Sequence, residues 1–466
     1  MTVERPTAHF IGIGGMGMRG LAEMLLDEGW AVSGSDREIT DYLRRLITRG
    51  ARIVEGQRAE NIDRDYDVVV HSAAIKAGNV ELAAARERGL PIRKYAQLLG
   101  QVMQQRRGVA ISGTHGKTTT TAMIAWALDR AGKDPSFVVG ADVPQLGSGS
   151  RSGGEILVAE ACEYDRSFHN LRPEVAVITF VEEDHRDYYT GGIDEIVESF
   201  SHFAGLVPER GLLVACAEKA PNVLRVCRSI RCPLETYALD DPRPWTWTGE
   251  TREISAGCYH IVVRRYGEFH CQIQLTAPGR HNALNALAAT AVLSHFGVPP
   301  EQIAAALGAF RGAERRCQPI GEVNGVSIVD DYAHHPTEIR CTLEALSQHY
   351  RNRRLWCVFQ PHQHSRTRFL LDDFARSFAR ATFVLVPRIY FVRDTQEERA
   401  LVNSRMLVER IRDNGGQAEY LPEFTEIEDR LVRDVRPGDV IVTLGAGPIW
   451  KVARAVCDRL GMKRAG

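Results

Sequence analysis

The sequence predicts an α/β protein of three domains with mainly parallel sheets. The chain has 466 residues, and at about 100–200 residues per domain this length favours about three domains. Short apolar runs alternate with helical patterns along most of the chain, an order that is typical of βαβ units. Two glycine-rich loops, at 12–17 and 113–118, each follow an apolar run and precede a helical pattern. These loops predict two separate nucleotide-binding folds.

The composition points to an ordinary globular protein. Hydrophobic residues make up 44%, charged residues 25%, and the formal net charge is −1, so no basic excess indicates a nucleic acid or an anionic membrane as a partner. No apolar run approaches the roughly 20 residues of a membrane helix, and the N-terminus lacks the pattern of an export signal. The 10 cysteines form no C-x-x-C pair. We therefore expect reduced thiols in a cytoplasmic protein.

The first domain is predicted over residues 1–106. Its opening stretch, HFIGIGGMGMRG at 9–20, has the Gly-x-Gly-x-x-Gly spacing of a strand–turn–helix unit that binds a diphosphate. Asp36 follows the last of these glycines, Gly17, by about 20 residues, where an acid that binds a ribose is expected. Further buried strands are predicted at 31–36 and 67–73. This motif alone fits NAD as well as other diphosphates, so a nicotinamide oxidoreductase is one open interpretation.

The second domain is predicted over residues 107–314 and contains a phosphate loop. The stretch ISGTHGKTTTT follows an apolar run and opens a helical pattern. Lys117 is suited to the outer phosphates of ATP, and the Thr118 hydroxyl to Mg²⁺. The full motif has a glycine where this chain has Ile111, so the loop is a shortened variant that begins at Gly113. A simple dehydrogenase has no use for an ATP site, which disfavours that interpretation.

Polar residues follow other predicted strands of the second domain. Glu160 and His185 end two apolar runs, and because open α/β sheets hold ligands at the carboxyl ends of their strands, both could complete a Mg²⁺ site. Taken singly, they could equally be a helix cap and a structural histidine. Asn282 and Asn285 open an Ala/Leu-rich helix, where their amides could bind an adenine edge or cap the helix. Alternating residues over 245–275 predict antiparallel strands.

The third domain is predicted over residues 315–466 and again places polar groups after strands. Strands are expected near 326–333, 355–361, 382–388 and 439–447. The first two deliver Asp331, Tyr332, His334 and His335, then His362, Arg366 and Arg368. Arginine binds phosphate and carboxylate through paired hydrogen bonds, so an anionic ligand is expected here.

The chain resembles the Mur ligase family over essentially its whole length. The resemblance rests on GIGGMGMRGLAE, GSD, GTHGKTTTT, VAEACEYD, EEDHRDYY, GRHNALNALAA, DDYAHHPTE, FQPHQHSRTR and LGAGPIWK, in this order. Within the family it most resembles the members that add L-alanine to UDP-N-acetylmuramate in peptidoglycan synthesis. The members that recycle a murein tripeptide onto the same acceptor are the alternative.

The resemblance implies a Rossmann-like domain that binds UDP, a central ATPase domain, and a dinucleotide-fold domain that closes over ATP and helps bind the amino acid. It implies ATP contacts from Gly113, Thr114, His115, Gly116, Lys117, Thr118, Thr119, His281, Asn282, Asn285, Arg315, Arg316 and Asp331. It implies contacts with the UDP substrate from Gly14, Gly15, Met16, Gly17, Ser35, Asp36 and Ser72. Catalytic roles are implied for Lys117, Glu160, His185, His334 and Arg366, and two Mg²⁺ sites for Thr118, Glu160 and His185.

The implied reaction transfers the ATP γ-phosphoryl group to a carboxylate, and the amine of L-alanine then attacks the acyl phosphate. Other family members carry a carbamylated lysine near the metal, but this chain has no lysine between Lys133 and Lys219. That absence fits the branch that adds L-alanine, with His185 as the second metal ligand.

Five positions depart from the family pattern. Acids are expected at Cys162 and Pro448, an arginine at Gln363, and a glycine and a phenylalanine at Glu314 and Cys317. The phosphate or carboxylate contact expected of the missing arginine is either absent or supplied by Arg368. These departures leave open a regulatory module with a dead ATPase, but the phosphate-loop lysine and the implied metal ligands are intact, so we expect an active enzyme.

Overall fold

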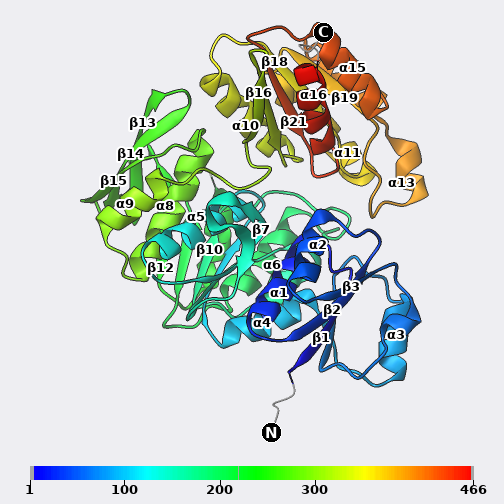
Figure 1. Ribbon diagram of the computed structural model, residues 1–466. Helices are drawn as coiled ribbons and strands as arrows, with labels where there is room; N and C mark the ends of the chain where they lie inside the picture. The colour runs from blue at the N-terminus through cyan, green and yellow to red at the C-terminus, as the bar shows by residue number, and fades with distance from the viewer. Residues whose placement is uncertain (1–4, 219, 463–466) are drawn as a thin grey trace.

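The computed structural model describes residues 5–218 and 220–462 and contains three sheets of five, ten and six strands. Most strand pairs are parallel, and helices flank each sheet (Figure 1). The predicted α/β class is therefore confirmed. Each sheet is formed by one continuous part of the chain, in the order first, central and C-terminal, and the three parts are called domains below.

The five-stranded sheet of the first domain has the order β3-β2-β1-β4-β5, and all its pairs are parallel. The strands are β1 (Thr7–Ile11), β2 (Ala31–Asp36), β3 (Arg52–Glu55), β4 (Val68–His71) and β5 (Ile92–Lys94), and the helices are α1 (Met16–Asp27), α2 (Asp41–Thr48), α3 (Val80–Glu87) and α4 (Tyr95–Gln104). Strand β2 coincides with its predicted range, whereas β3 and β5 were not predicted.

The ten-stranded sheet of the central domain has the order β15-β14-β13-β12-β11-β10-β6-β9-β7-β8. Its strands are β6 (Arg107–Ser112), β7 (Ser136–Val143), β8 (Ser148–Arg151), β9 (Ile156–Glu160), β10 (Val175–Ile178), β11 (Leu212–Cys216), β12 (Leu234–Leu239), β13 (Trp247–Ser255), β14 (Cys258–Arg265) and β15 (Glu268–Gln274). Strands β13, β14 and β15 are antiparallel, which confirms the prediction for 245–275.

The helices of the central domain place its functional loops. They are α5 (Lys117–Arg130), α6 (Ile193–Ala204), α7 (Pro221–Val226), α8 (Arg280–His295) and α9 (Pro300–Gly308). Helix α8 is buried on all sides from Asn282 to Leu293, as expected for a helix that is apolar around its whole circumference. It packs against α5 (Figure 1), and Gly116, which precedes α5, lies close to Asn285 in the first turns of α8.

The six-stranded sheet of the C-terminal domain has the order β16-β17-β21-β18-β19-β20. Its strands are β16 (Gln318–Val323), β17 (Val326–Asp331), β18 (Leu355–Phe359), β19 (Phe383–Val386), β20 (Ala418–Tyr420) and β21 (Val440–Leu444). Its helices are α10 (Pro336–His349), α11 (His364–Phe369), α12 (Leu371–Ala375), α13 (Gln396–Leu401), α14 (Ser404–Asp413), α15 (Phe424–Asp434) and α16 (Trp450–Met462). Two separate apolar clusters, one on each face of the sheet, show that it is covered on both sides.

The apolar cores show how the three domains are joined. One continuous buried cluster includes residues of both the first and the central sheet, and α1 packs directly on β7 and β8. The side chain of Glu23 in α1 accepts hydrogen bonds from Ser148 and Ser150 across this contact. The C-terminal domain has its own cores. It therefore meets the central domain mainly through polar groups, which form the site described below.

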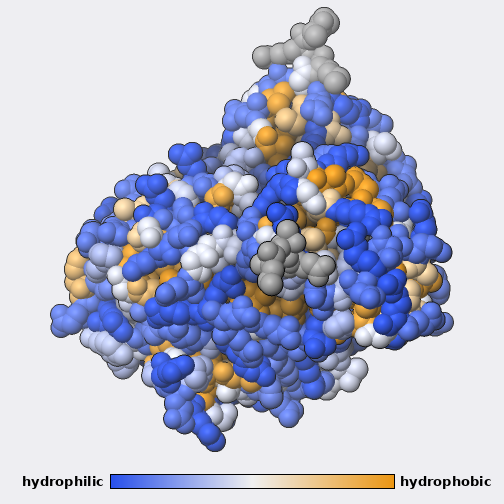
Figure 2. Space-filling model, turned by 60° about the horizontal axis from the view of Figure 1, so that its bottom comes forward, coloured by the Kyte–Doolittle hydropathy of each residue, from blue (hydrophilic) through white to orange (hydrophobic). Residues whose placement is uncertain are grey.

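No helix within residues 5–218 and 220–462 combines the length and the apolarity needed to cross a bilayer. On the face shown in Figure 2, apolar residues are scattered among polar ones.

Candidate functional site

The phosphate loop connects β6 to α5, as the sequence predicts. Gly113 and Gly116 have φ angles of 136° and 82°, a left-handed backbone that favours glycine. A Cβ at Gly116 would also lie 2.7 Å from the Oδ1 atom of Asn285 in α8. The loop therefore needs glycine both for its turn and for its close approach to α8. Because α5 begins at Lys117, its free backbone N–H groups are available to an anion.

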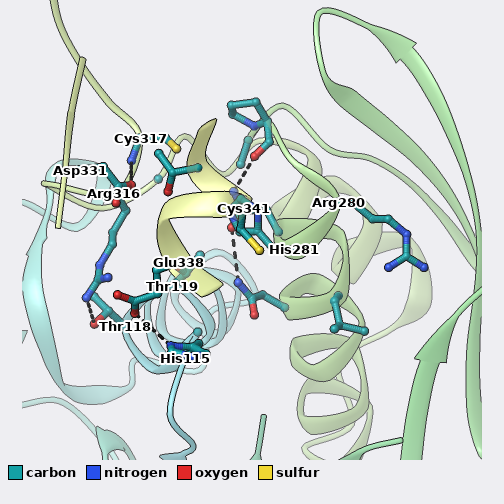
Figure 3. Close-up of a pocket in the computed structure, with 18 of the residues that line it drawn as sticks. His115, Thr118, Thr119, Arg280, His281, Arg316, Cys317, Asp331, Glu338 and Cys341 are labelled. Carbon is teal, nitrogen blue, oxygen red and sulfur yellow. Dashed lines mark hydrogen bonds and ion pairs between the residues drawn. The ribbon is translucent and has the colours of Figure 1, made fainter. Parts of the chain in front are cut away.

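A pocket of about 320 Å³ lies where α5, α8 and α10 meet (Figure 3). The residues predicted to bind ATP that line it are His115, Gly116, Thr118, Thr119, His281, Asn282, Asn285, Arg316 and Asp331. Burial lowers the pKa of His281 to about 4, so its ring is neutral. Asn285 donates to the Oδ1 atom of Asn282 at 3.4 Å. The pocket thus has amide and imidazole groups toward α8 and the phosphate loop at its other side.

Arg315 and Arg316 lie next to each other but face different surroundings. The Nη2 atom of Arg316 donates to the Thr118 hydroxyl at 2.9 Å (Figure 3). Arg315 instead pairs with Asp330 at 2.9 Å and donates to the backbone oxygen of Gly445. Of the two predicted ATP contacts, only Arg316 therefore reaches the pocket, from the junction between the central and C-terminal domains.

The ammonium group of Lys117 is held by a carboxylate that was not predicted as part of the site. Its Nζ atom lies 3.0 and 2.9 Å from the two carboxylate oxygens of Glu163 and 2.5 Å from the Gly113 oxygen. Burial alone would lower the pKa of Lys117, but the charge of Glu163 outweighs burial and raises it. Lys117 is therefore a cation that is paired with a carboxylate in this structure.

The three predicted metal ligands, Thr118, Glu160 and His185, are not in mutual contact in this structure. Glu160 accepts a hydrogen bond from the Gly140 N–H at 2.5 Å, and Thr118 accepts one from Arg316. The carboxylate beside His185 is that of Glu163, with an Nε2–Oε1 distance of 3.7 Å. Glu163 is the second acid of the stretch EACEYD, and its position there was the only sequence feature that could have pointed to it. The assignment of Glu160 as a ligand stays a prediction.

A buried ion pair joins the central and C-terminal domains beside His185. The Nε and Nη2 atoms of Arg366 lie 3.0 and 2.9 Å from the Oδ1 atom of Asp184, and both side chains are at least nine-tenths buried. Burial raises the pKa of the Asp184 carboxyl, but Arg366 outweighs burial and holds that pKa well below its usual value. Burial lowers the pKa of His334 to about 3. The charge of Arg366 is therefore balanced by Asp184, whereas the imidazole of His334 is uncharged.

A second polar cluster joins the phosphate loop to α10. His115 Nε2 lies 3.0 Å from Glu182, and its Nδ1 lies 3.3 Å from Glu338. Burial lowers the pKa of His115, but the two carboxylates outweigh burial and raise it to about 9. His335 lies close enough to His115 and Glu182 that the three side chains have the spacing of a metal site. However, the Nδ1 atom of His335 accepts a hydrogen bond from the Thr337 N–H at 3.3 Å. The proton of this imidazole is therefore on Nε2. The cluster is thus an imidazolium between two carboxylates.

In the first domain, Asp36 is hydrogen-bonded to the glycine-rich turn that follows β1. The Gly14 N–H donates to Asp36 at 2.7 Å, so Asp36 supports the turn. Ser35 is fully buried and donates to Glu81 at 2.7 Å, which directs its hydroxyl away from the exposed side of the loop. Its predicted role toward uridine is therefore not supported by its placement. Gly15, Met16 and Gly17 lie in the turn and at the start of α1, and Ser72 follows β4.

A second pocket of about 260 Å³ lies where all three domains meet. Met16 and Arg19 of the first domain line it, together with Gly140 of the central domain and Arg316 and Trp450 of the C-terminal domain. Arg316 also lines the pocket beside the phosphate loop. The two pockets therefore share one arginine as a common wall.

The positions that depart from the family pattern have distinct environments. Cys317 lines the pocket beside the phosphate loop, and its N–H donates to Asp331 (Figure 3). Gln363 is 1% exposed and accepts a hydrogen bond from Arg393 at 3.3 Å. Arg368 pairs with Glu398 instead, at 3.1 Å, and both side chains are partly exposed. This ion pair does not support Arg368 as the replacement for the missing arginine, and the suggestion stays a prediction.

Comparisons with known proteins agree with this architecture. Residues 7–107 match the model described as Mur ligase family, catalytic domain, residues 111–293 the Mur ligase middle domain, and residues 315–447 the Mur ligase, glutamate ligase domain. The UDP-N-acetylmuramate–L-alanine ligase of Pelotomaculum thermopropionicum is 44% identical over 457 residues, 97% of each chain. The ligase of the same name from Acetivibrio thermocellus is 42% identical over 95% of this chain and 94% of its own.

Solved structures extend the comparison. The UDP-N-acetylmuramate–alanine ligase of Thermotoga maritima matches with a TM-score of 0.84 at 27% identity and covers 98% of this chain and 100% of its own. A murein peptide ligase from Psychrobacter arcticus matches with a TM-score of 0.74, also at 27% identity, over 98% of this chain and 99% of its own. With three matched domains and relatives of this identity over nearly the full length, the chain belongs to the Mur ligase family.

Proposed function

We propose that the protein joins L-alanine to the lactyl carboxylate of UDP-N-acetylmuramate, in peptidoglycan synthesis, and consumes ATP through an acyl-phosphate intermediate. The observation that carries this proposal is the pair of pockets that share Arg316. One adjoins the phosphate loop, and the other reaches the glycine turn of the first domain. A nucleotide and a UDP-linked acceptor would meet at their common wall.

In this proposal ATP binds between α5 and α8, with adenine toward Asn282 and Asn285 and the phosphates toward the start of α5. The γ-phosphate would replace Glu163 as the partner of Lys117, since that ammonium group is the cation at the helix start. UDP-N-acetylmuramate would place its diphosphate at Gly14–Gly17, with Asp36 supporting the turn. The proposal keeps the predicted domain boundaries near residues 106 and 314.

We propose that two Mg²⁺ ions bind at the phosphate loop. Thr118 and Glu160 would offer a hydroxyl and a carboxylate oxygen, the donors that Mg²⁺ prefers, and His185 would offer an imidazole nitrogen. Glu163, which lies beside both Lys117 and His185, adds a second carboxylate to this set. When bound, the metal would neutralise charge on the transferring phosphoryl group.

The chemistry follows from the weakness of a carboxylate as an electrophile. Transfer of the γ-phosphoryl group to the lactyl oxygen makes the acyl carbon reactive, and the neutral amine of L-alanine attacks it. The tetrahedral intermediate then expels phosphate, which takes up the proton that the amine nitrogen loses. Lys117 and Arg316 neutralise developing negative charge. The Asp184–Arg366 pair holds the C-terminal domain against the central domain, which excludes water that would hydrolyse the acyl phosphate.

The test is release of phosphate from ATP in the presence of Mg²⁺ and UDP-N-acetylmuramate, with a panel of L-alanine, glycine, L-serine and a murein tripeptide. Stimulation by L-alanine is expected. Stimulation by the tripeptide alone would favour the recycling ligase, which the resemblance to the murein peptide ligase of Psychrobacter arcticus keeps as the second candidate. No stimulation by any of them would contradict both.

A further inference from the structure

We propose that Arg393 binds the carboxylate of the incoming amino acid. The inference rests on the proposed function and assigns a residue that sequence analysis did not select. Arg393 lies in the C-terminal domain between β19 and α13.

The need for such a residue follows from the substrate. A free amino acid carries a carboxylate, and bringing that group between two domains without a cation is unfavourable. Two cations next to His185 already have carboxylate partners: Lys117 pairs with Glu163 at 2.9 Å, and Arg366 pairs with Asp184 at 2.9 Å. Both belong to the phosphate-transfer and domain-closure parts of the site, so neither is free for the substrate.

Within the part of the chain that the structure describes, Arg393 forms no ion pair with a carboxylate. Its hydrogen-bond partners are neutral groups, the amide of Gln363 at 3.3 Å and the side chain of Tyr164. Its backbone is left-handed, with φ at 60°. The side chain is exposed, so most of its five N–H donors remain available to an anion.

The position of Arg393 connects it to the reacting groups. Its guanidinium carbon lies 4.4 Å above the ring of Tyr164 of the central domain, a stacking arrangement that suits arginine. The Tyr164 ring is in turn 5.1 Å from the ring of His185. Arg393 therefore crosses from the C-terminal domain onto the edge of the site that carries His185 and Glu163.

The separation suits an amino acid. An attacking amine must approach the acyl carbon to about 3 Å, and a charge-assisted hydrogen bond to its carboxylate spans about 2.8 Å. With the short body of an α-amino acid between these contacts, the substrate bridges a gap of about 9 Å. The contacts of Tyr164 with His185, at 5.1 Å, and with Arg393, at 4.4 Å, set an upper limit of similar size on the distance between His185 and the guanidinium group.

Gln363 positions Arg393 without removing its charge. It is 1% exposed and stands in the left-handed region, with φ at 70°, so the amide is fixed in place. A carboxylate at the same position would pair with the guanidinium and compete with the substrate. Gln363→Glu, which has almost the same shape, is therefore a second and independent perturbation.

The experiment measures steady-state phosphate release for the full-length wild type, Arg393→Gln and the matched control Arg368→Gln. Arg368 belongs to the same domain, but Glu398 already neutralises it. We expect Arg393→Gln to raise KM for L-alanine by roughly 10- to 100-fold, the loss typical of a hydrogen bond to a charged group. The value of kcat should stay within about threefold, and KM for ATP and for UDP-N-acetylmuramate should be unchanged. Arg368→Gln should match the wild type.

L-Alaninamide lacks the carboxylate, so its kcat/KM separates loss of a carboxylate contact from general damage to the structure, which would affect both substrates. In Arg393→Gln its kcat/KM should equal that of the wild type, so the preference for L-alanine over the amide should fall by the same factor as the rise in KM. Gln363→Glu should lower this preference in the same direction. An unchanged preference in both variants, or equal losses with the two substrates, would overturn the assignment.

Failure of the inference is distinguishable from failure of the proposed function. If the wild type releases phosphate in response to L-alanine and Arg393→Gln keeps its preference, only the assignment of Arg393 is wrong. If the wild type does not respond to L-alanine, the proposed function itself fails.

Discussion

Replacing Asp184 by asparagine tests how the C-terminal domain is held against the central domain. The two nitrogens of Arg366 lie 3.0 and 2.9 Å from one oxygen of Asp184, and the side chains are only 5% and 9% exposed. Breaking a buried pair by removing one charge costs about 3–5 kcal/mol. Asparagine keeps an oxygen acceptor at the same place, so we expect the lower end, about 3 kcal/mol.

The cost should fall on domain closure, because the pair lies between two domains that have separate cores. Opening would rehydrate Arg366 and relieve the penalty without unfolding either domain. We therefore expect kcat/KM for L-alanine to fall about 100-fold, the factor that about 3 kcal/mol implies. The thermal midpoint should change by only a few degrees.

The assay is steady-state phosphate release together with calorimetric unfolding of Asp184→Asn, Arg366→Gln and the double variant. The double variant should be less impaired than the sum of the single effects, with a coupling of at least about 1 kcal/mol, because each single change removes the same pair. Activity of Asp184→Asn within threefold of the wild type would refute the reasoning. So would losses that simply add in the double variant.

Three further changes follow from contacts around the phosphate loop. Lys117→Ala should abolish amino-acid-dependent phosphate release but leave calorimetric binding of UDP-N-acetylmuramate within about threefold, since that ligand is assigned to another domain. Glu163→Gln should tighten binding of Mg²⁺-free ATP severalfold, measured by calorimetry, because the carboxylate competing for Lys117 is removed; weaker binding would contradict this. The pKa of His115, raised to about 9, means that its ion pairs with Glu182 and Glu338 stabilise the protein fully below about pH 6.5 and are lost as the pH rises through 9. The thermal midpoint should fall over this interval in the wild type and fall less in His115→Gln; equal slopes would count against the assigned charge.

The strands and the phosphate loop were predictable because their signals are local. Strand β2 coincides with the run AVSGSD, and the Gly-Lys-Thr motif opens α5. The three-residue β5 and the four-residue β3 were not predicted. Both are partly exposed edge strands with few apolar residues, so neither has the buried run that identifies a central strand.

The choice between Glu160 and Glu163 could not be made from spacing. Glu160 is the last residue of β9, and its side chain reaches the Gly140 N–H of the neighbouring β7. Glu163 lies beyond the strand, where the chain turns and brings its carboxylate to Lys117. Which acid meets the lysine depends on the direction of each side chain at a strand end. Side-chain direction there is set by tertiary contacts, which leave no local pattern.

The same reasoning explains why the first glycine motif could not identify its ligand. The turn recognises a diphosphate, and Asp36, the acid that suggested a ribose contact, is used to hold the Gly14 N–H. The ligand is distinguished by the pocket of about 260 Å³ that adjoins this turn. Arg316 lines that pocket and also the pocket beside the phosphate loop. A ligand bound there would have its diphosphate at one domain and its reacting group beside the ATP site of another. That arrangement requires residues from three separate parts of the chain, so the folded structure was needed to turn a diphosphate motif into a substrate site.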